Sequence, residues 1–63
     1  MINVVFVIDD DRVYSGNISV YPEGENPDKS FFISVDANMF KDTDKALKLA
    51  QLCCDKLNKE VKG

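Results

Sequence analysis

Three consecutive aspartates, Asp9, Asp10 and Asp11, form the densest group of chemically active side chains in this sequence. They directly follow the apolar residues 4–8, and carboxylate oxygens are the ligands that hard cations prefer. Such a cation needs several oxygens that converge from different segments, which three adjacent residues do not supply. Asp also favours turns, because its side chain hydrogen-bonds to nearby backbone. We therefore predict an acidic turn at the tip of a hairpin, with partner binding as a second role and no metal.

The stretch VVFVIDDD, residues 4–11, resembles the first strand of a response-regulator receiver domain and the acidic residues after it. The resemblance implies a magnesium ion at these residues, with a phosphoacceptor aspartate and a lysine from later strands. A receiver domain needs a helix after this strand and a long doubly wound α/β chain. Here the next segment, RVYSGNISVY at residues 12–21, has the composition of a returning strand. The resemblance ends with this stretch, and we expect no phosphoacceptor site.

Nucleophilic catalysis has few candidate residues in this sequence. There is no histidine, which excludes a Ser-His or Cys-His pair, and the three glycines are isolated, which gives no Gly-rich phosphate loop. The adjacent Cys53 and Cys54 fall on the predicted buried face of a helix, where a thiol stays unreactive. Adjacent helical residues point about 100° apart, so we expect two reduced thiols. We predict that the protein is not an enzyme and uses no cofactor or metal.

Charge is distributed unevenly along the chain. Residues 1–40 carry seven acidic and two basic side chains, a formal charge of −5, whereas residues 41–63 carry six lysines and four acidic side chains, a charge of +2. The tail SFFISVD…KDTDKALKLAQLCCDKL resembles the last strand and second helix of a double-stranded RNA-binding domain, which implies RNA contact by lysines near the start of the helix. The acidic N-terminal part argues against nucleic acid as the main partner. As the alternative function we keep an RNA- or DNA-binding module whose candidate residues are Lys41, Lys45, Lys48, Lys56 and Lys59.

Hydrophobic patterning predicts three strands and one helix. β-Branched and aromatic residues indicate strands at residues 2–8, 12–21 and 30–36, with a loop at residues 22–29. Apolar residues at helical spacing predict a helix with Asp42 or Thr43 as its N-cap, running to about Val61. The sequence therefore predicts an α+β fold in a single domain of residues 1–63. In this fold a three-stranded antiparallel sheet is packed on one face by a C-terminal helix (β-β-β-α).

Alternation along the strands assigns side chains to the two faces of the sheet. The face toward the helix should carry Ile2, Val4, Phe6, Ile8, Tyr14, Ile18, Val20, Phe31, Ile33 and Val35. For the first two strands to share this face, the hairpin between them must have an odd loop of three residues or five. The helix should cover the face with Ala46, Leu47, Ala50, Cys53, Cys54, Leu57 and Val61.

The opposite face of the sheet has no helix to cover it. It should present an apolar group made of Val5, Val7, Val13 and Phe32, with Tyr21 near the edge. An uncovered apolar face on so small a protein indicates a contact surface. Leu52, by contrast, is expected to be a single exposed leucine among helix lysines, which needs no functional explanation.

We therefore predict a non-catalytic protein-interaction module that uses the exposed sheet face and the acidic hairpin tip. Its candidate protein-binding residues are Val5, Val7, Asp9, Asp10, Asp11, Val13 and Phe32. The partner is another protein or a second copy of this chain, since a homodimer would enlarge a marginal core. Small acidic chains with few cysteines are typical of phage and mobile-element accessory proteins, which suggests a small regulator or inhibitor. The N-terminus lacks a signal-peptide pattern and the longest apolar run is five residues, so we expect a cytoplasmic protein without a membrane segment.

Overall fold

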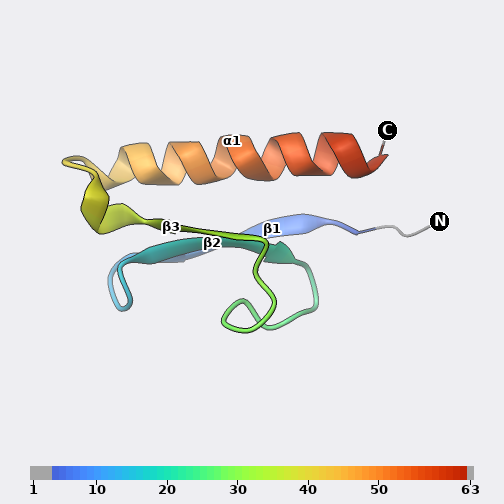
Figure 1. Cartoon of the computed structure of the whole chain (residues 1–63), viewed down its shortest axis with the longest axis horizontal. Coiled ribbons are helices and arrows are strands. Elements are labelled where there is room, and N and C mark those ends of the chain that lie inside the picture. The colour runs from blue at the N-terminus through green and yellow to red at the C-terminus, as the bar shows by residue number, and fades with distance from the viewer. Residues whose placement is uncertain (1–3, 63) are drawn as a thin grey trace.

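The computed structural model describes residues 4–62, which form a three-stranded sheet and one long helix. The elements in chain order are β1 (Phe6–Asp11), β2 (Asn17–Pro22), β3 (Ile33–Asp36), the short 3-10 helix η1 (Ala37–Met39) and α1 (Thr43–Lys62). The strands are antiparallel and lie in the order β1-β2-β3. Figure 1 shows α1 along one face of the sheet, with the β1–β2 turn and the β2–β3 loop toward the other face. The predicted β-β-β-α fold is confirmed.

The first hairpin turns over residues 12–16, so its loop has the longer of the two odd lengths that the strand faces allow. The backbone oxygen of Asp11 accepts hydrogen bonds from the N–H groups of Tyr14, Ser15 and Gly16. Gly16, the last residue of the turn, has a φ of +83°. This left-handed backbone conformation costs little for a residue without Cβ. The turn geometry therefore fixes the start of β2 at the next residue.

All three strands begin later than the sequence indicates. β1 starts at Phe6 rather than at residue 2, and the predicted core residue Ile2 lies outside the described residues. β2 starts at Asn17 rather than at residue 12, so Tyr14, which we expected to face the helix, lies in the turn and is 90% exposed. β3 starts at Ile33 rather than at residue 30, and Phe31, also expected to face the helix, is half exposed in the loop. In both places, residues that favour strands occupy a connection because no neighbouring strand is there to pair with them.

The core lies between α1 and the sheet face that carries Phe6, Ile18 and Val20. Ile18 and Val20 come from the central strand and are fully buried. α1 meets them with a row of small side chains spaced four residues apart, namely Ala46, Ala50 and Cys54. Small side chains let the helix approach the sheet closely, so this narrow row is enough to bury the middle strand.

The flanks of α1 are less deeply buried than this row. Leu47 and Leu57 are half-buried against the core, whereas Val61, which the helical pattern assigned to the buried face, is 44% exposed. The 20 residues of α1 span about 30 Å, and the six of β1 about 20 Å, so the helix is longer than the sheet it covers. No helix within residues 4–62 is long and apolar enough to cross a membrane.

Three hydrogen bonds fix the start of α1. The carboxylate of Asp42 accepts a hydrogen bond from the N–H of Asp44 at 3.0 Å, so of the two predicted N-caps Asp42 is the one used. Arg12, in the hairpin turn, reaches across to the same helix end. Its guanidinium donates to Asp44 at 3.0 Å and to the Thr43 hydroxyl at 3.3 Å. The turn and the first residues of α1 are thereby joined.

Candidate functional site

The three aspartates lie within β1 and do not form the tip of the hairpin. They pair in register with β2, because the hydrogen bonding of the ladder outweighs the preference of Asp for turns. Successive residues of a strand point to opposite faces, so Asp10 lies on the face toward α1 and Asp9 and Asp11 on the other. The predicted acidic turn is therefore wrong, and residues 12–16 form the tip instead. Among the residues that the structure describes, no three Asp, Glu, Cys or His side chains are grouped so that they could hold a metal ion.

Asp10 has a structural partner in the hairpin turn. The Arg12 guanidinium donates to its carboxylate at 2.9 Å, and this hydrogen bond holds the pKa of Asp10 below its ordinary value. The bonds to Asp10 and Asp44 together raise the pKa of Arg12. Arg12 therefore links the end of β1 to the start of α1 through two carboxylates. The partner-binding role predicted for Asp10 remains a prediction.

The sheet face opposite α1 is mostly polar. Val7 lies on it, paired with Tyr21, and alternation places Val5 on the same side. Val13, predicted to join them, is in the hairpin turn and is 88% exposed. This face also has a hollow of about 210 Å³, in which the polar side chains of Asp9, Asp11, Asn17, Ser19 and Ser34 lie beside Phe31 and Pro27. Of the apolar group predicted for this face, Val5 and Val7 lie on it with Tyr21, whereas Val13 does not, because the hairpin turn comes later in the chain than expected.

Phe32 does not belong to the opposite face either. Its N–H donates to the backbone oxygen of Val20 at 2.7 Å, although Val20 is the residue that pairs with Ile33. Phe32 and Ile33 therefore both lie opposite Val20, which is the arrangement of a β-bulge. A bulge turns a side chain away from the face that regular alternation along the strand would give it. Phe32 instead packs edge to face on Phe6, with ring centroids 5.7 Å apart. It therefore lies on the side of the sheet that α1 covers.

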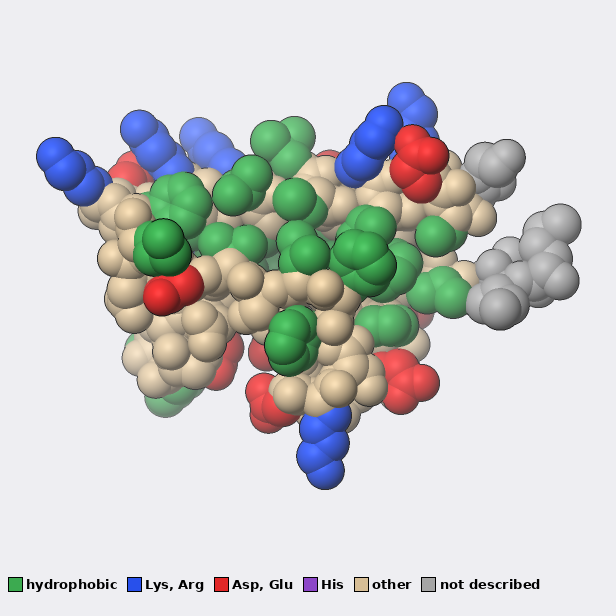
Figure 2. Space-filling model, viewed as in Figure 1, with side chains coloured by type: hydrophobic (Ala, Val, Ile, Leu, Met, Phe, Trp, Pro, Cys, Tyr) green, Lys and Arg blue, Asp and Glu red, His purple; other side chains and the backbone are tan. Residues whose placement is uncertain are grey.

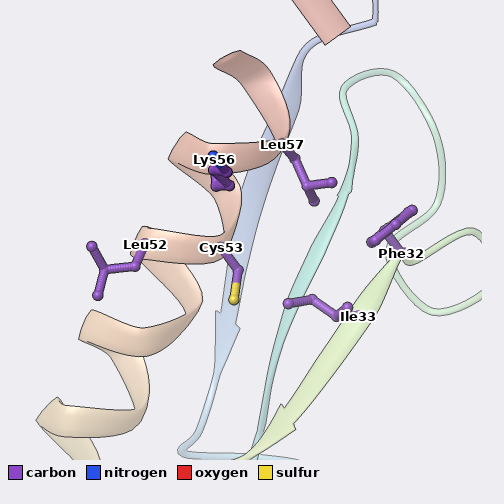
Figure 3. Close-up of a pocket in the computed structure, with 6 residues that line it drawn as sticks. All are labelled: Phe32, Ile33, Leu52, Cys53, Lys56 and Leu57. Carbon is purple, nitrogen blue, oxygen red and sulfur yellow. The ribbon is translucent and has the colours of Figure 1, made fainter. Parts of the chain in front are cut away.

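An open apolar groove runs between the beginning of β3 and the C-terminal half of α1. Its volume is about 340 Å³, and its lining consists of Phe32, Ile33, Leu52, Cys53, Lys56 and Leu57. Figure 3 shows Ile33 directed toward α1 and Cys53 and Leu57 directed toward the sheet, while Leu52 lies at the outer rim and points away from β3. Five of the six side chains are apolar, yet Phe32 is 60% exposed and Leu52 is 67% exposed. We take this groove as the candidate functional site.

Asn58 explains why the groove is open. Its side chain accepts from the N–H of Phe6 at 2.7 Å and donates to the carbonyl of Phe6 at 3.0 Å, as a neighbouring strand would. The buried thiol of Cys54 donates to the same carbonyl at 3.1 Å, and burial raises the pKa of this thiol. These bonds hold the C-terminal half of α1 against β1, which is one edge of the sheet, and the opposite flank of the helix overhangs β3 at the other edge.

Asn58 is not among the residues predicted from the sequence. Its signal is positional: it lies four residues after Cys54 and eight after Ala50, so it continues the row of small side chains that faces the sheet. A polar residue in such a row should have a backbone partner, because a buried polar group without one is costly.

The lysines of the nucleic-acid alternative are all exposed. Four of them, Lys45, Lys48, Lys56 and Lys59, lie within about 40° of Leu52 around the helix axis, on the outward flank of α1, and Lys41 precedes the helix. Of these lysines, Lys56 lines the groove. Leu52 and the 43% exposed Leu49 share this flank. Leu52 is therefore not a solitary exposed leucine, as we predicted, but part of the apolar surface at the groove (Figure 2).

No protein-family model, curated protein or solved structure matches this chain. The groove is consequently the main source of information about function. Its lining offers apolar contact area with one ammonium group at the rim, which suits the apolar side chains of a partner.

Proposed function

We propose that this protein is a non-catalytic protein-interaction module that binds its partner in the groove between β3 and α1. The observation that carries the proposal is the exposure of Phe32 and Leu52 beside an apolar hollow. Large apolar side chains gathered around a concave surface are typical of binding sites, whereas scattered ones are not. A role as a small regulator or inhibitor, which acts by covering a partner's surface, is the form of activity that we propose for it.

The groove replaces the opposite sheet face as the proposed binding surface. On that face Val5, Val7 and Tyr21 form a small apolar group, and the neighbouring hollow is lined by Phe31 and Pro27 together with polar side chains. The groove, in contrast, adjoins further hydrophobic side chains on the same side of the molecule (Figure 2). The helical period places the exposed Leu49 beside Lys56 and Cys53, on the same side of α1 as the groove. Binding in the groove requires no movement of the core.

A quantitative pull-down with matched variants tests the proposal. The wild type, Leu52→Glu and Val13→Glu would be immobilised at equal density and exposed to native lysate, and bound proteins would be compared by mass spectrometry. Both variants place one new carboxylate at an exposed apolar position, the first at the groove and the second at the hairpin tip. Partners that bind in the groove should be lost with Leu52→Glu and retained with Val13→Glu. Loss of partners with Val13→Glu but not with Leu52→Glu would place the binding surface at the hairpin tip instead.

Nucleic-acid binding is the second candidate, and the observation that favours it is the group of four lysines on one flank of α1. Labelled RNA and DNA duplexes and single strands would be titrated with the protein at low and moderate salt. Attraction to phosphates is strongest at low salt, so absence of binding there removes this candidate.

A further inference from the structure

The groove side of α1 carries a narrow stripe of side chains that is separate from the row facing the sheet. An arc of about 100° around the helix axis contains six residues, of which five are exposed and Cys53 is half-buried. Three of the six also line the groove. Lys48 and Lys59 lie outside this arc, toward Asp55 and Asp44. In chain order the stripe consists of Lys45, Leu49, Leu52, Cys53, Lys56 and Glu60.

The stripe is arranged symmetrically about the middle of the helix. Because α1 spans Thr43–Lys62, its midpoint lies between Leu52 and Cys53. Leu49 and Lys56 lie equally far from this midpoint on its two sides, and so do Lys45 and Glu60. When two such helices pack antiparallel with their midpoints together, each residue meets the one that is equally far from the midpoint. The outer positions then bring a lysine against a glutamate, and the inner positions bring the apolar side chains together.

We propose that the occupant of the groove is a second copy of this chain, whose α1 packs antiparallel to the first across a two-fold axis near Leu52 and Cys53. This inference rests on the proposed function and names the partner. Each copy places Leu49 and Leu52 at the groove of the other, beside the exposed ring of Phe32. A two-fold contact needs one self-complementary patch, and the symmetrical stripe provides it.

Charge selects the antiparallel arrangement. Glu60 is paired with Lys56 of its own chain at 3.1 Å, and in the dimer it also meets Lys45 of the other copy. Two-fold symmetry repeats this contact, so one complementary pair contributes two attractions. Parallel helices would instead set Lys45 against Lys45 and Glu60 against Glu60, and like charges that face each other across an interface are repulsive.

The contact surface is small. A 20-residue helix is about 30 Å long and roughly 10 Å wide, so its stripe and the adjoining groove offer less than the about 800 Å² that each partner buries in an interface of standard size. We therefore expect a dimer that exchanges with monomer and dissociates on dilution.

Other occupants have less support. Addition of a strand to the free edge of β3 would find few backbone partners, because β3 is only four residues long. Nucleic acid would leave the apolar lining of the groove without a matching group, and its phosphates would be repelled by Glu60 of the stripe.

Reciprocal charge substitutions test the arrangement. Lys45→Glu sets carboxylate against carboxylate at both symmetric contacts, and Glu60→Lys sets ammonium against ammonium. In sedimentation equilibrium each variant alone should dissociate at least about tenfold more readily than the wild type. An equimolar mixture of the two variants restores both attractions and should form a heterodimer, which native mass spectrometry identifies when one variant is isotope-labelled.

Two further variants complete the experiment. Leu52→Glu, at the centre of the stripe, should be monomeric where the wild type is dimeric. Lys29→Glu makes the same charge change as Lys45→Glu at an exposed position of the β2–β3 loop, remote from α1, and should remain dimeric. Circular dichroism of every variant checks that its helix and sheet are retained.

The outcomes separate this inference from the proposed function. A wild type that stays monomeric at the highest attainable concentration, while Leu52→Glu still loses a partner from lysate, would overturn the second copy and leave the groove as a binding site. A monomeric wild type whose lysate partners are all retained by Leu52→Glu would overturn both. A dimer that Leu52→Glu leaves intact would place the contact elsewhere, and failure of the mixture to form a heterodimer would overturn the antiparallel arrangement.

Discussion

Asn58 provides both polar groups that close the edge of β1 at Phe6, where no further strand follows. Replacing it with Ala leaves the N–H of Phe6 without its partner and the carbonyl with only the thiol of Cys54. We predict that Asn58→Ala lowers the free energy of unfolding by about 2 kcal/mol, measured by urea denaturation. The neighbouring exposed substitution Lys59→Ala is the control and should change stability by less than about 0.5 kcal/mol. Equal effects of the two variants would contradict the role of Asn58.

The two adjacent cysteines should react differently. The thiol of Cys54 is buried and bonded to a carbonyl, and its raised pKa keeps it protonated at neutral pH, whereas Cys53 lines the open groove. Because the thiolate is the reactive form, iodoacetamide should modify Cys53 in the native protein and leave Cys54 intact. Peptide mass spectrometry measures the extent of modification at each cysteine. In the control, unfolded protein, the two cysteines should react to the same extent. Preferential modification of Cys54 would show that α1 does not lie as described.

Asp10 gives stability a defined pH dependence. Its hydrogen bond from Arg12 lowers its pKa in the folded state below the ordinary 3.8, so the folded protein binds this proton less readily than the unfolded chain. The stabilisation is therefore complete above 3.8 and is lost as the pH falls through the lower, folded-state pKa. We predict that Asp10→Asn is less stable than the wild type at neutral pH and that the difference disappears in acid. Asp28→Asn, which removes a carboxylate that pairs with no other described residue, is the control.

At the scale of elements, the hairpin turn determines where the strands begin. Gly16 has a positive φ, and a Cβ added there would lie 2.6 Å from the side-chain nitrogen of Asn38. Gly24 has a similar φ of +92° but nothing within 4 Å of an added Cβ. Gly24→Ala thus measures the backbone cost alone, about 1 kcal/mol, and Gly16→Ala should cost more. The measurement is the thermal unfolding temperature of each variant. If Gly24→Ala lowers it as much as Gly16→Ala does, the contact with Asn38 does not affect stability.

Regular patterns in the sequence predicted the strands and the helix, but they did not predict the irregular contacts between these elements. The order β-β-β-α and the buried row of Ala46, Ala50 and Cys54 follow from periodicity, because one repeating preference acts over many residues. The position of the first turn does not follow, since local preference places it at the aspartates while pairing with β2 places it after them. The orientation of Phe32 depends on a bulge, which alternation cannot reveal.

The candidate site escaped prediction for the same reason. It forms where a helix held to one edge of the sheet by Asn58 overhangs a short strand at the other edge. Leu52 and Phe32 lie twenty residues apart in the sequence, and nothing local to either predicts that they line one groove. The lysine flank was visible as a helical pattern, but its relation to an apolar surface required the fold.

At the scale of the whole molecule, we expect contact with a partner on the face that bears the groove (Figure 2). The opposite side has a hollow of mixed lining and a hairpin tip whose exposed apolar residues, Val13 and Tyr14, line neither that hollow nor the groove. A single binding face also suits a small regulator, which leaves the rest of its surface in solvent.

Site-specific photo-crosslinking tests this central claim most directly. A benzophenone amino acid would replace Leu52 at the groove in one variant and Val13 at the hairpin tip in another, and both would be irradiated in native lysate. We expect a crosslinked partner from position 52 and none from position 13. A crosslink from position 13 with none from position 52 would contradict it.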